Sequence, residues 1–589
     1  MPPVWAIALA CPNCRGAVEC VGDRIRCEAC GIVGARPREG LLTFAPAESS
    51  GETDGRTAGR WAVRTPADLE RLLREDGPLD GAAWMYFVPP LAHRTVLSID
   101  DGLGGASLAA AAHGARHVYC LHPDRAHAGV VAGLAAARGV RDFTVVTPSG
   151  KVRLPFADHV FDVVALHAAV TGHGSAGSAW GDRSLLLREL VRVLRPDGVL
   201  HLDGHSAGLV GRPGQSSPPS LPLLRTVLGL WRRGVRPRRL LRRFEAEGRS
   251  YRATGVLRRH AVLRDLKPAA GVLLRGARLA LVAGAPHETL RDAILRQLPR
   301  GDPSETATLH FGSGHAFRIQ TRDFVVRLPR GEGALRRCRN GFASLGRLAQ
   351  LSLSFATPRP VMEGSVEGHA FLVETRIRGR EIPYLRLSGG RLGELAGEAG
   401  RMLTELHTRT RRREPLDADR FRALIRGPLM ALREGSDAEV AAQLDGALSV
   451  LEAGFLHTPT DLVTTHGDFK VTNLVGGGAG GVRGLVDWDL CEEAGLPAMD
   501  LILYRAFDRV LLHKQPFAEA ILGVTDVGPG EDPLIQRYRQ EFQIDEPHWR
   551  AYGLLSLAHY FLRLAGIPRA GQAARLRGTI LAACRALRG

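Results

Sequence analysis

Residues 466–473 read HGDFKVTN, and residues 484–489 read GLVDWD. This arrangement suits transfer of a phosphoryl group from a nucleotide to a hydroxyl group. Asp468 is expected on a loop, where its carboxylate can accept a proton from a hydroxyl oxygen that attacks a γ-phosphoryl group. Asn473, further along the loop, and Asp487, at the end of a strand, offer the oxygen ligands that Mg²⁺ prefers. The two segments therefore predict a magnesium-dependent phosphotransferase site.

Two more residues of the first segment have expected roles. Lys470, one of only four lysines in the chain, can neutralise charge on the transferred phosphoryl group. His466 is expected to anchor the loop through hydrogen bonds rather than to react. The whole pattern resembles the signature of the aminoglycoside phosphotransferase and choline kinase-like superfamily, over residues 304–589. The resemblance implies a two-lobed, protein-kinase-like fold that uses ATP and Mg²⁺, with Asp468 and Lys470 as the catalytic residues.

The first lobe of such a fold is expected in residues 308–329, which read as strands with a glycine-rich turn between them, and in a further strand, after a helix, at residues 371–379. By the resemblance, Gly312 and Gly314 would lie over the nucleotide phosphates, and Arg327 would contact them. Arginine keeps a fixed charge and can bind phosphate through two hydrogen bonds. The next helix lacks an obvious glutamate to pair with this cation, so either Glu332 serves or the ion pair is absent.

Strands alternate with helices in the middle of the chain, which predicts a parallel sheet covered by helices on both faces. Residues 154–156 (LPF), 161–164 (FDVV) and 192–198 (RVLRPDG) follow one another in this segment, together with Glu189. The segment resembles the class I S-adenosylmethionine (SAM)-dependent methyltransferases, over residues 61–285. The resemblance implies a Rossmann-like sheet.

The ligand-binding positions of such a methyltransferase are altered here. Ser98 stands where the family has an acidic residue, and His122 stands where a carboxylate would bind the ribose hydroxyls. Residues 147–149 (TPS) supply no carboxylate near the adenine, although Asp124 could substitute for His122. The remaining candidate cofactor contacts are Gly102, Gly104 and Asp162. Two hypotheses stay open, a domain that binds SAM and a degenerate domain that serves as a scaffold.

Near the amino terminus, two C-x2-C pairs are joined by a short hairpin at residues 19–26. Two such pairs can place four thiolates at the corners of a tetrahedron, as in a closed structural Zn²⁺ site. The expected ligands are Cys11, Cys14, Cys27 and Cys30. A redox role for each pair is the alternative, and Cys20 is the spare thiol. The segment resembles the small zinc ribbons that precede many bacterial methyltransferases.

The chain is strongly basic, with a net charge of +17 and 74 arginines against four lysines. This bias is typical of a GC-rich bacterial genome, so much of the charge is background. Residues 231–244 are denser in arginine and predict either a helix on an anionic membrane surface or, as the alternative, a solvated basic helix. No nucleic-acid motif accompanies them. Residues 4–11 read as a strand rather than a signal peptide, and a cytoplasmic location is expected.

These features predict a multidomain α/β and α+β protein with a zinc ribbon, a Rossmann-like methyltransferase sheet and a two-lobed, protein-kinase-like phosphotransferase. The expected boundaries are 1–48 for the ribbon, 49–60 for a linker, 61–285 for the methyltransferase-like domain, 286–303 for a second linker and 304–589 for the kinase. The favoured function is phosphorylation of a hydroxyl on a small molecule, such as a sugar, a glycan end or an aminoglycoside. The alternative is a non-catalytic assembly protein that uses both folds for binding.

Overall fold

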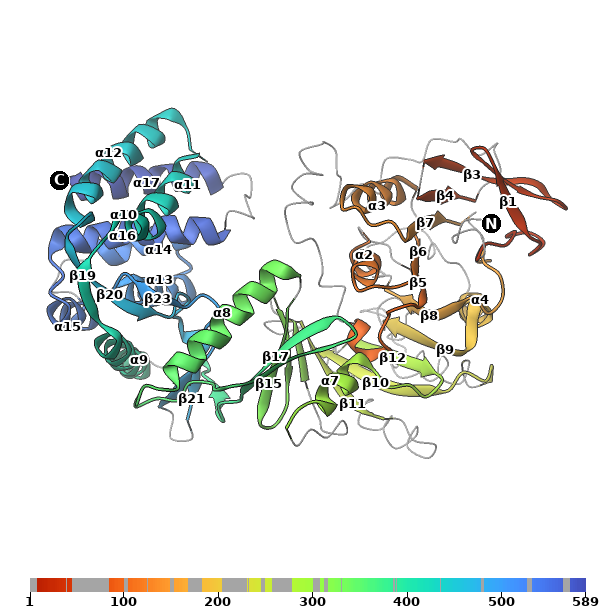
Figure 1. Cartoon of the computed structure of the whole chain (residues 1–589), viewed down its shortest axis with the longest axis horizontal. Coiled ribbons are helices and arrows are strands. Elements are labelled where there is room, and N and C mark those ends of the chain that lie inside the picture. Colours follow the sequence, from red (N-terminus) through yellow and green to blue (C-terminus); the bar gives the residue numbers. More distant parts are fainter. Residues whose placement is uncertain are drawn as a thin grey trace. The chain divides into compact units, whose positions relative to one another are not determined.

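The computed structural model forms two compact units (Figure 1). The first comprises residues 1–322, 326–330 and 363–371, and the second comprises residues 323–325, 331–362 and 372–589. The structure describes residues 8–38, 40–44, 84–99, 104–123, 125–148, 153–167, 183–203, 230, 232–244, 249–256, 278–299, 308–311, 316–329, 331–384, 387, 389–434, 436–477, 481–526, 532–564 and 572–588.

The core of the first unit is a parallel sheet in the order β7-β6-β5-β8-β9 (Figure 1). Its strands are β5 (Thr95–Ile99), β6 (His117–Leu121), β7 (Phe143–Thr147), β8 (Phe161–Leu166) and β9 (Leu194–Asp203). The helices between them are α2 (Gly105–Ala112), α3 (Arg125–Ala137) and α4 (Arg183–Val193). Almost every residue of β5 to β8 is buried, as is typical of parallel strands covered on both faces. The predicted parallel sheet is confirmed.

Antiparallel strands continue this sheet beyond β9. β12 (Arg278–Gly284) pairs with β9, and β10 (Pro237–Phe244) pairs with both β12 and β11 (Arg249–Val256). The helix expected over residues 231–244 is therefore wrong, because residues 237–244 form a strand. Long-range pairing decides this structure, with Leu240 opposite Leu281 and Arg242 opposite Leu279. In the same unit, β11 also pairs with β13 (Thr308–Phe311), which pairs with β14 (Ala316–Gln320).

The Cys-rich segment forms a small antiparallel ribbon that joins the parallel sheet. Its strands are β1 (Val18–Val21), β2 (Arg24–Cys27), β3 (Gly31–Arg38) and β4 (Leu41–Thr43), and β1 and β2 make the expected hairpin. β4 pairs in parallel with β7, with Thr43 opposite Thr147. Phe44 is fully buried in a core that also contains Tyr119 and Phe156. Of the strand expected at residues 4–11, the described part contributes one isolated bridge, between Leu9 and Phe156.

The strands expected in the first lobe of the kinase are present. They are β13, β14, β15 (Phe324–Pro329) and β17 (His369–Thr375), and β16 (Pro360–Val366) is an additional strand that the sequence analysis missed. A short helix, α7 (Leu290–Arg296), precedes them. The glycine-rich turn with Gly312 and Gly314 lies outside the described residues, as does the linker expected at 49–60.

The second unit is mainly helical, with two small sheets. Its helices include α8 (Glu332–Leu348), α9 (Gly389–Thr410), α10 (Ala418–Phe421), α11 (Gly427–Glu434), α12 (Ala438–Phe455), α13 (Met499–His513), α14 (Phe517–Thr525), α15 (Pro533–Glu541), α16 (Glu546–Leu564) and α17 (Gln572–Arg588). One sheet has the order β18 (Arg380–Glu381), β21 (Leu474–Gly476), β22 (Val482–Leu485), and the other β19 (Arg412–Pro415), β20 (Pro459–Thr465), β23 (Glu492–Gly495). One continuous hydrophobic core holds these helices and sheets together.

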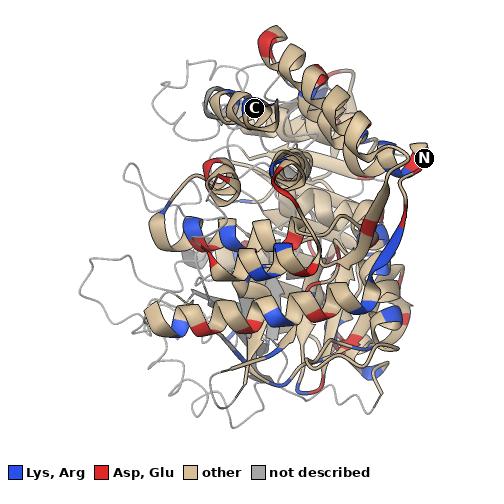
Figure 2. Ribbon diagram, turned by 90° about the vertical axis from the view of Figure 1, so that its left-hand side faces the viewer, with Lys and Arg blue, Asp and Glu red and all other residues tan. Residues whose placement is uncertain are grey.

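The surface of the second unit mixes both signs of charge. Figure 2 shows basic and acidic residues interspersed along its helices. None of the helices in the described part of the chain is long and apolar enough to cross a membrane.

Candidate active site

The loop that carries the HGD sequence leaves the end of β20 through a tight turn. Gly467 has a φ of 78°, and a Cβ at this position would lie 2.1 Å from the carbonyl oxygen of Leu490. Any side chain would collide at this close approach, and glycine also adopts the left-handed conformation without strain. The turn brings Asp468 beside Lys470, whose Nζ lies 2.7 Å from Asp468 Oδ2. Both side chains are 24% exposed, so the pair remains accessible to a ligand.

Asn473 closes the loop and fixes the orientation of the Asp468 carboxylate. Its Nδ2 donates to the Asp468 carbonyl oxygen at 2.8 Å and to Asp468 Oδ2 at 3.3 Å. Lys470 and Asn473 therefore both hold Oδ2, while Oδ1 makes no hydrogen bond with the described residues. The amide oxygen of Asn473 likewise accepts none from them. One oxygen of Asp468 and one of Asn473 thus have no hydrogen-bond partner among the described residues, and Asn473 itself is 6% exposed.

The segment that carries Asp487 is attached directly to this loop. The backbone N–H of Val486 donates to the carbonyl oxygen of Asn473 at 3.0 Å. Asp487 follows with a φ of 75°, a left-handed conformation that aspartate tolerates better than most residues. The structure therefore brings the segments of the two sequence-predicted oxygen ligands together. A carboxylate and an amide oxygen suit a hard cation such as Mg²⁺.

His466 is fully buried and connects the loop of Asp468 to the segment that carries Asp487. Its Nδ1 accepts from the backbone N–H of Asp468 at 3.2 Å, and its Nε2 lies 3.0 Å from the carbonyl oxygen of Val486. This pattern requires a proton on Nε2 and a lone pair on Nδ1, which is the neutral tautomer. Burial lowers the pKa of His466, in agreement with that form. The anchoring role expected from the sequence is confirmed by these bonds.

A buried carboxylate on α13 holds the loop, and the sequence analysis missed it. Asp500 is fully buried and accepts the backbone N–H groups of His466 at 2.6 Å and Gly467 at 2.8 Å. Nε2 of His407 lies 3.5 Å from Asp500 Oδ2, and Nδ1 of His407 contacts the hydroxyl of Tyr538. Burial alone would raise the pKa of Asp500, but the interactions with His407 and the backbone bond from His466 outweigh it, and the pKa is lowered.

The signal for Asp500 in the sequence is a charged residue within the apolar run LPAMDLIL, at residues 496–503. Carboxylates are rarely buried without a partner, so an acidic residue on the buried face of a helix implies donors nearby. The partners themselves come from distant segments. His407 lies on α9 and Tyr538 on α15.

The structure describes the cation expected to contact phosphate in the first lobe, and that contact stays a prediction. Arg327 lies on β15 and is 4% exposed, so it is a buried cation in a strand. Glu332, one of the two options for its partner, extends into solvent with its side chain 94% exposed and lies 3.8 Å from Arg336. The structure therefore gives no support to Glu332 as the ion-pair partner.

The four predicted zinc ligands lie together in the ribbon. The Sγ atoms of Cys11, Cys14, Cys27 and Cys30 all lie within 4.8 Å of one another. Two sulfurs at about 2.3 Å from one tetrahedral zinc ion are about 3.8 Å apart, so this cluster fits the ion. Hydrogen bonds from the backbone N–H of Gly16 and from the thiols of Cys27 and Cys30 lower the pKa of Cys14 to about 7, while the bond to Cys14 raises the pKa of Cys30 to about 12. Cys20 lies outside the cluster.

At the carboxyl ends of β5 and β6, the described residues include no acidic side chain that would bind a nucleoside. Ser98 is fully buried, and the hydroxyl of Ser107 donates to it at 2.8 Å. His122 is also fully buried, and Thr147 pairs with the ribbon strand β4. Gly104 has a φ of 71° and begins α2, where a Cβ would lie 2.5 Å from Val131. The described end of the glycine-rich turn after β5 therefore keeps its glycine, whereas Gly102 and Asp124 lie outside the described residues.

Asp162 requires a correction, because the structure does not bring it to this edge. It is the second residue of β8 and therefore lies at the amino end of the strand. Its Oδ2 accepts the backbone N–H of Thr95 at 2.8 Å, and its Oδ1 accepts from Arg195 at 2.7 Å. Ligands of open α/β sheets bind outside the carboxyl ends of the strands. Asp162 therefore ties strands together rather than binding a cofactor.

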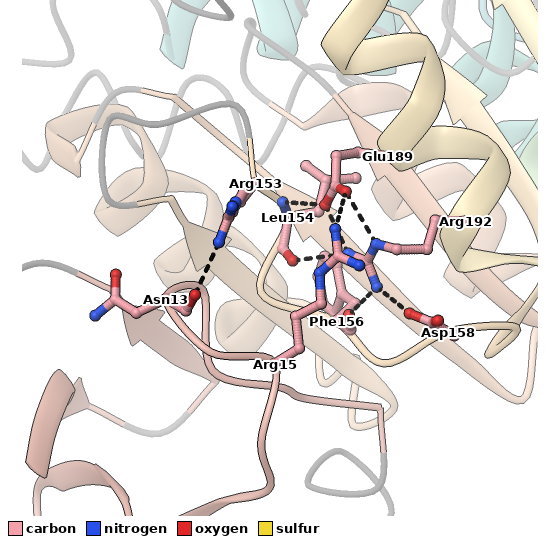
Figure 3. A network of polar contacts seen from close by, with 8 residues as sticks. All are labelled: Asn13, Arg15, Arg153, Leu154, Phe156, Asp158, Glu189 and Arg192. Carbon is pink, nitrogen blue, oxygen red and sulfur yellow. Dashed lines mark hydrogen bonds and ion pairs between the residues drawn. The ribbon is translucent and has the colours of Figure 1, made fainter. Parts of the chain in front are cut away.

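Glu189, another residue of the methyltransferase-like pattern, forms a network with the ribbon (Figure 3). Arg192 donates to Glu189 from Nε at 3.0 Å and from Nη2 at 2.7 Å. Arg15 of the ribbon donates to the same carboxylate at 3.1 Å, and the backbone N–H of Leu154 donates at 3.0 Å. Arg192 also donates to Asp158 at 2.7 Å. The carboxylate of Glu189 therefore connects the Cys-rich ribbon to the methyltransferase-like part of the first unit.

Two parts of the chain match known family models. Residues 99–202 match the family model described as a methyltransferase domain, and residues 305–512 match that of the phosphotransferase enzyme family. No curated protein matches the sequence of the chain.

Several solved structures are similar to parts of the chain. A SAM-dependent methyltransferase from Aquifex aeolicus is 15% identical, covers 37% of this chain and 97% of its own, and has a TM-score of 0.25. The streptomycin–ATP–APH(2")-IIa ternary complex is 15% identical, covers 48% and 93%, and has a TM-score of 0.30. Aminoglycoside phosphotransferase APH(3'')-Id from Streptomyces rimosus, solved with ADP and streptomycin, is 16% identical, covers 41% and 90%, and has a TM-score of 0.28.

Proposed function

We propose that this protein is an ATP- and Mg²⁺-dependent phosphotransferase that phosphorylates a hydroxyl group of a small molecule. The proposal rests on the hydrogen bonding of the Asp468 carboxylate. Lys470 and Asn473 hold its Oδ2, while Oδ1 accepts no hydrogen bond from the described residues. A carboxylate with one oxygen fixed and the other free can receive a proton from an acceptor hydroxyl.

In the proposed reaction, Asp468 Oδ1 accepts the hydroxyl proton as the acceptor oxygen forms a bond to the γ-phosphorus of ATP. The bond from that phosphorus to the β–γ bridging oxygen breaks, and ADP leaves with the electron pair. Lys470, which is paired with Asp468 in the structure, is close enough to stabilise negative charge on the transferred group. The products are a phosphate ester, ADP and the proton held by Asp468.

Asn473 and Asp487 are the proposed ligands of the magnesium ion. When bound, Mg²⁺ would neutralise charge on the phosphate oxygens of the nucleotide. The bond from Val486 to Asn473 keeps the two ligand segments in register. Asp500 and His466 act on the reaction by positioning this loop, and they are not expected to touch the substrate.

Calorimetric titration of the full chain with Mg·ATP tests this assignment of roles. Asp487→Asn removes a charged metal ligand, so Mg·ATP should bind at least about tenfold more weakly. Asp468→Asn should bind Mg·ATP within about threefold of the wild type, because the proposed role of Asp468 is on the acceptor. If the wild type binds no Mg·ATP, the phosphotransferase proposal fails and the assembly-protein alternative takes its place.

For the middle domain we propose a structural role with weak or absent SAM binding. The buried Ser98–Ser107 pair and the buried His122 support this proposal, because they leave the described ends of β5 and β6 without a carboxylate. Each charge-assisted hydrogen bond to a ribose hydroxyl is worth about 1.5–3 kcal/mol. SAM should therefore not bind saturably at low micromolar concentration in equilibrium dialysis. Tight, saturable binding would reverse the proposal and assign catalysis to this domain as well.

A further inference from the structure

The antiparallel strands beyond β9 run from the methyltransferase-like part of the first unit into the first lobe of the phosphotransferase. β9 pairs with β12, β12 with β10, β10 with β11, and β11 with β13. The last of these pairs joins residues 249–252 to residues 308–311, with Tyr251 opposite Leu309. β13 then pairs with β14. The first strands of the lobe are therefore connected by backbone hydrogen bonds to the sheet of the methyltransferase-like part.

Two pairs of rings connect the same parts through their side chains. Tyr86 precedes β5 and is 3% exposed, whereas Phe317 lies on β14 and is 1% exposed. Their ring centroids are 5.8 Å apart and the rings meet at 89°, which is the edge-to-face arrangement that aromatic pairs favour. His113, which follows α2, stacks on His369 of β17, with ring centroids 4.4 Å apart. Both contacts join the methyltransferase-like part to strands of the first lobe.

The stacked imidazoles are both neutral near pH 7. Burial lowers the pKa of His113 to about 3, and His369 contributes in the same direction. Burial also lowers the pKa of His369, although the charge of Glu367 opposes this shift. Two charged rings at this spacing would repel each other, whereas two neutral rings can pack. The stack is therefore compatible with a permanent interface at neutral pH.

Helix α7, within the segment 286–303 that the sequence predicts as a linker, joins the two parts a third time. The backbone N–H of Leu290 donates to the carbonyl oxygen of Val88 at 3.1 Å, and both residues are buried. Near the other end of the helix, Nε2 of Gln297 donates to the carbonyl oxygen of Ser365, on β16, at 3.4 Å. This segment therefore bridges the methyltransferase-like part and the first lobe.

The compact first unit consequently ends inside the phosphotransferase rather than at its predicted boundary. It includes residues 326–330 and 363–371 of the first lobe. Arg327, the cation expected to contact phosphate, is among them. The expected nucleotide contact and the methyltransferase-like sheet thus belong to one compact unit.

We propose that the methyltransferase-like part has a further function, as the support on which the first lobe of the phosphotransferase folds. Without β11, β13 would be an edge strand with unpaired backbone groups. Without Tyr86, part of the buried surface of Phe317 would meet water. The proposal explains why the two domains occur in one chain, because the earlier domain completes the later one. Its consequence for nucleotide binding rests on the phosphotransferase function proposed above.

Amide hydrogen exchange of the full chain, followed by mass spectrometry, tests this support. Tyr86→Leu removes the ring that packs against Phe317. Exchange in residues 316–329, taken relative to exchange in β8, should become at least about tenfold faster than in the wild type. The comparison with β8 removes the effect of any general loss of stability in the first unit.

Tyr119→Leu is the matched control for this variant. Tyr119 is 1% exposed in the same unit, and its ring packs against Phe156 and Phe161 within the methyltransferase-like part. The same substitution at this position should leave the exchange of residues 316–329 relative to β8 within about threefold of the wild type.

His113→Ala is a milder second variant, which decides the matter if Tyr86→Leu does not fold. His113 is only half-buried, so its loss should leave the methyltransferase-like part folded. Because the variant removes the stack on His369, exchange in residues 360–375 relative to β8 should become at least about threefold faster.

Mg·ATP provides a readout that simple packing would not change. At a hundred times its dissociation constant, a ligand suppresses openings that abolish its binding about a hundredfold. If the first lobe opens only together with its support, bound Mg·ATP must also stabilise the support, since the two events are linked. Exchange in residues 84–88 and 290–296 should therefore become at least about tenfold slower when Mg·ATP is added.

The inference is overturned if Tyr86→Leu changes the relative exchange of the lobe no more than Tyr119→Leu does, or if His113→Ala leaves residues 360–375 unchanged. It is also overturned if Mg·ATP binds but slows exchange in neither 84–88 nor 290–296, an outcome that leaves the phosphotransferase proposal intact. A wild type that binds no Mg·ATP would remove the proposed function, and the variants without nucleotide would then decide this inference by themselves.

Discussion

Replacement of Asp500 by asparagine tests how the catalytic loop is held. The carboxylate is fully buried and accepts two backbone N–H groups, from His466 and Gly467. Charge-assisted bonds of this kind contribute about 1.5–3 kcal/mol each. Asparagine keeps one acceptor oxygen and turns its NH₂ group towards the other donor. We therefore expect the loop to lose about 3 kcal/mol of local stability.

Amide hydrogen exchange of the full chain, followed by mass spectrometry of peptides that cover residues 459–476, measures this loss directly. A loss of about 3 kcal/mol corresponds to exchange about a hundredfold faster in that segment. Asp419→Asn is the control, because the side chain of Asp419 is 86% exposed and its ion pair with Arg422 should contribute less than about 1 kcal/mol. Exchange within about threefold of the wild type in Asp500→Asn would refute the positioning role.

The same variant has a defined pH dependence. The pKa of Asp500 is lowered in the folded protein, so its stabilising effect is present above the unfolded pKa of about 3.9 and is lost as pH falls through the folded value. The difference in exchange between wild type and Asp500→Asn should therefore be constant near neutral pH and should shrink below about pH 4. A difference that grows on acidification would contradict the assignment.

Two further predictions concern the first unit. Freshly purified, reduced protein should contain one zinc ion per chain by elemental analysis. Cys11→Ser should lower this content, whereas Cys20→Ser should leave it unchanged, because Cys20 lies outside the cluster. Wild-type protein that contains no metal would refute the proposed zinc site. Glu189→Gln should destabilise the first unit by about 3 kcal/mol in urea denaturation, since Glu189 is 5% exposed and pairs with Arg192. Asp158→Asn is the control, because Asp158 pairs with the same arginine but its side chain is 56% exposed, so the variant should lose less than about 1 kcal/mol of stability. Equal losses of stability in the two variants would contradict the argument from burial.

The parts of the site that the sequence predicted are those held by short-range contacts. Asp468, Lys470 and Asn473 are separated by five residues or fewer, so one loop conformation brings them together. The four cysteines are similarly fixed by two short turns and one hairpin. The parallel sheet was predictable because its buried strands alternate with helices along the chain.

The parts that the sequence did not predict depend on contacts between distant segments. Asp500 lies close to His407, which in turn contacts Tyr538, and no local pattern of the sequence records partners this far apart in the chain. The basic stretch 237–244 became a strand because β12 and β11 pair with it, although its arginines and leucines are compatible with a helix. The strand that carries Asp162 was predicted correctly. Its predicted role in cofactor binding was wrong, because that role depends on which end of the strand the residue occupies.

The phosphotransferase assignment is tested most directly by nucleotide turnover in the Asp468→Asn variant. Formation of ADP from Mg·ATP should be measured with water as a slow acceptor, for wild type, Asp468→Asn and Asp419→Asn. A general base contributes about 10²–10⁴-fold, so Asp468→Asn should turn over at least about a hundredfold more slowly than the wild type. Asp419→Asn should match the wild type. Turnover by Asp468→Asn near the wild-type rate would contradict the central claim that Asp468 is the base of this site.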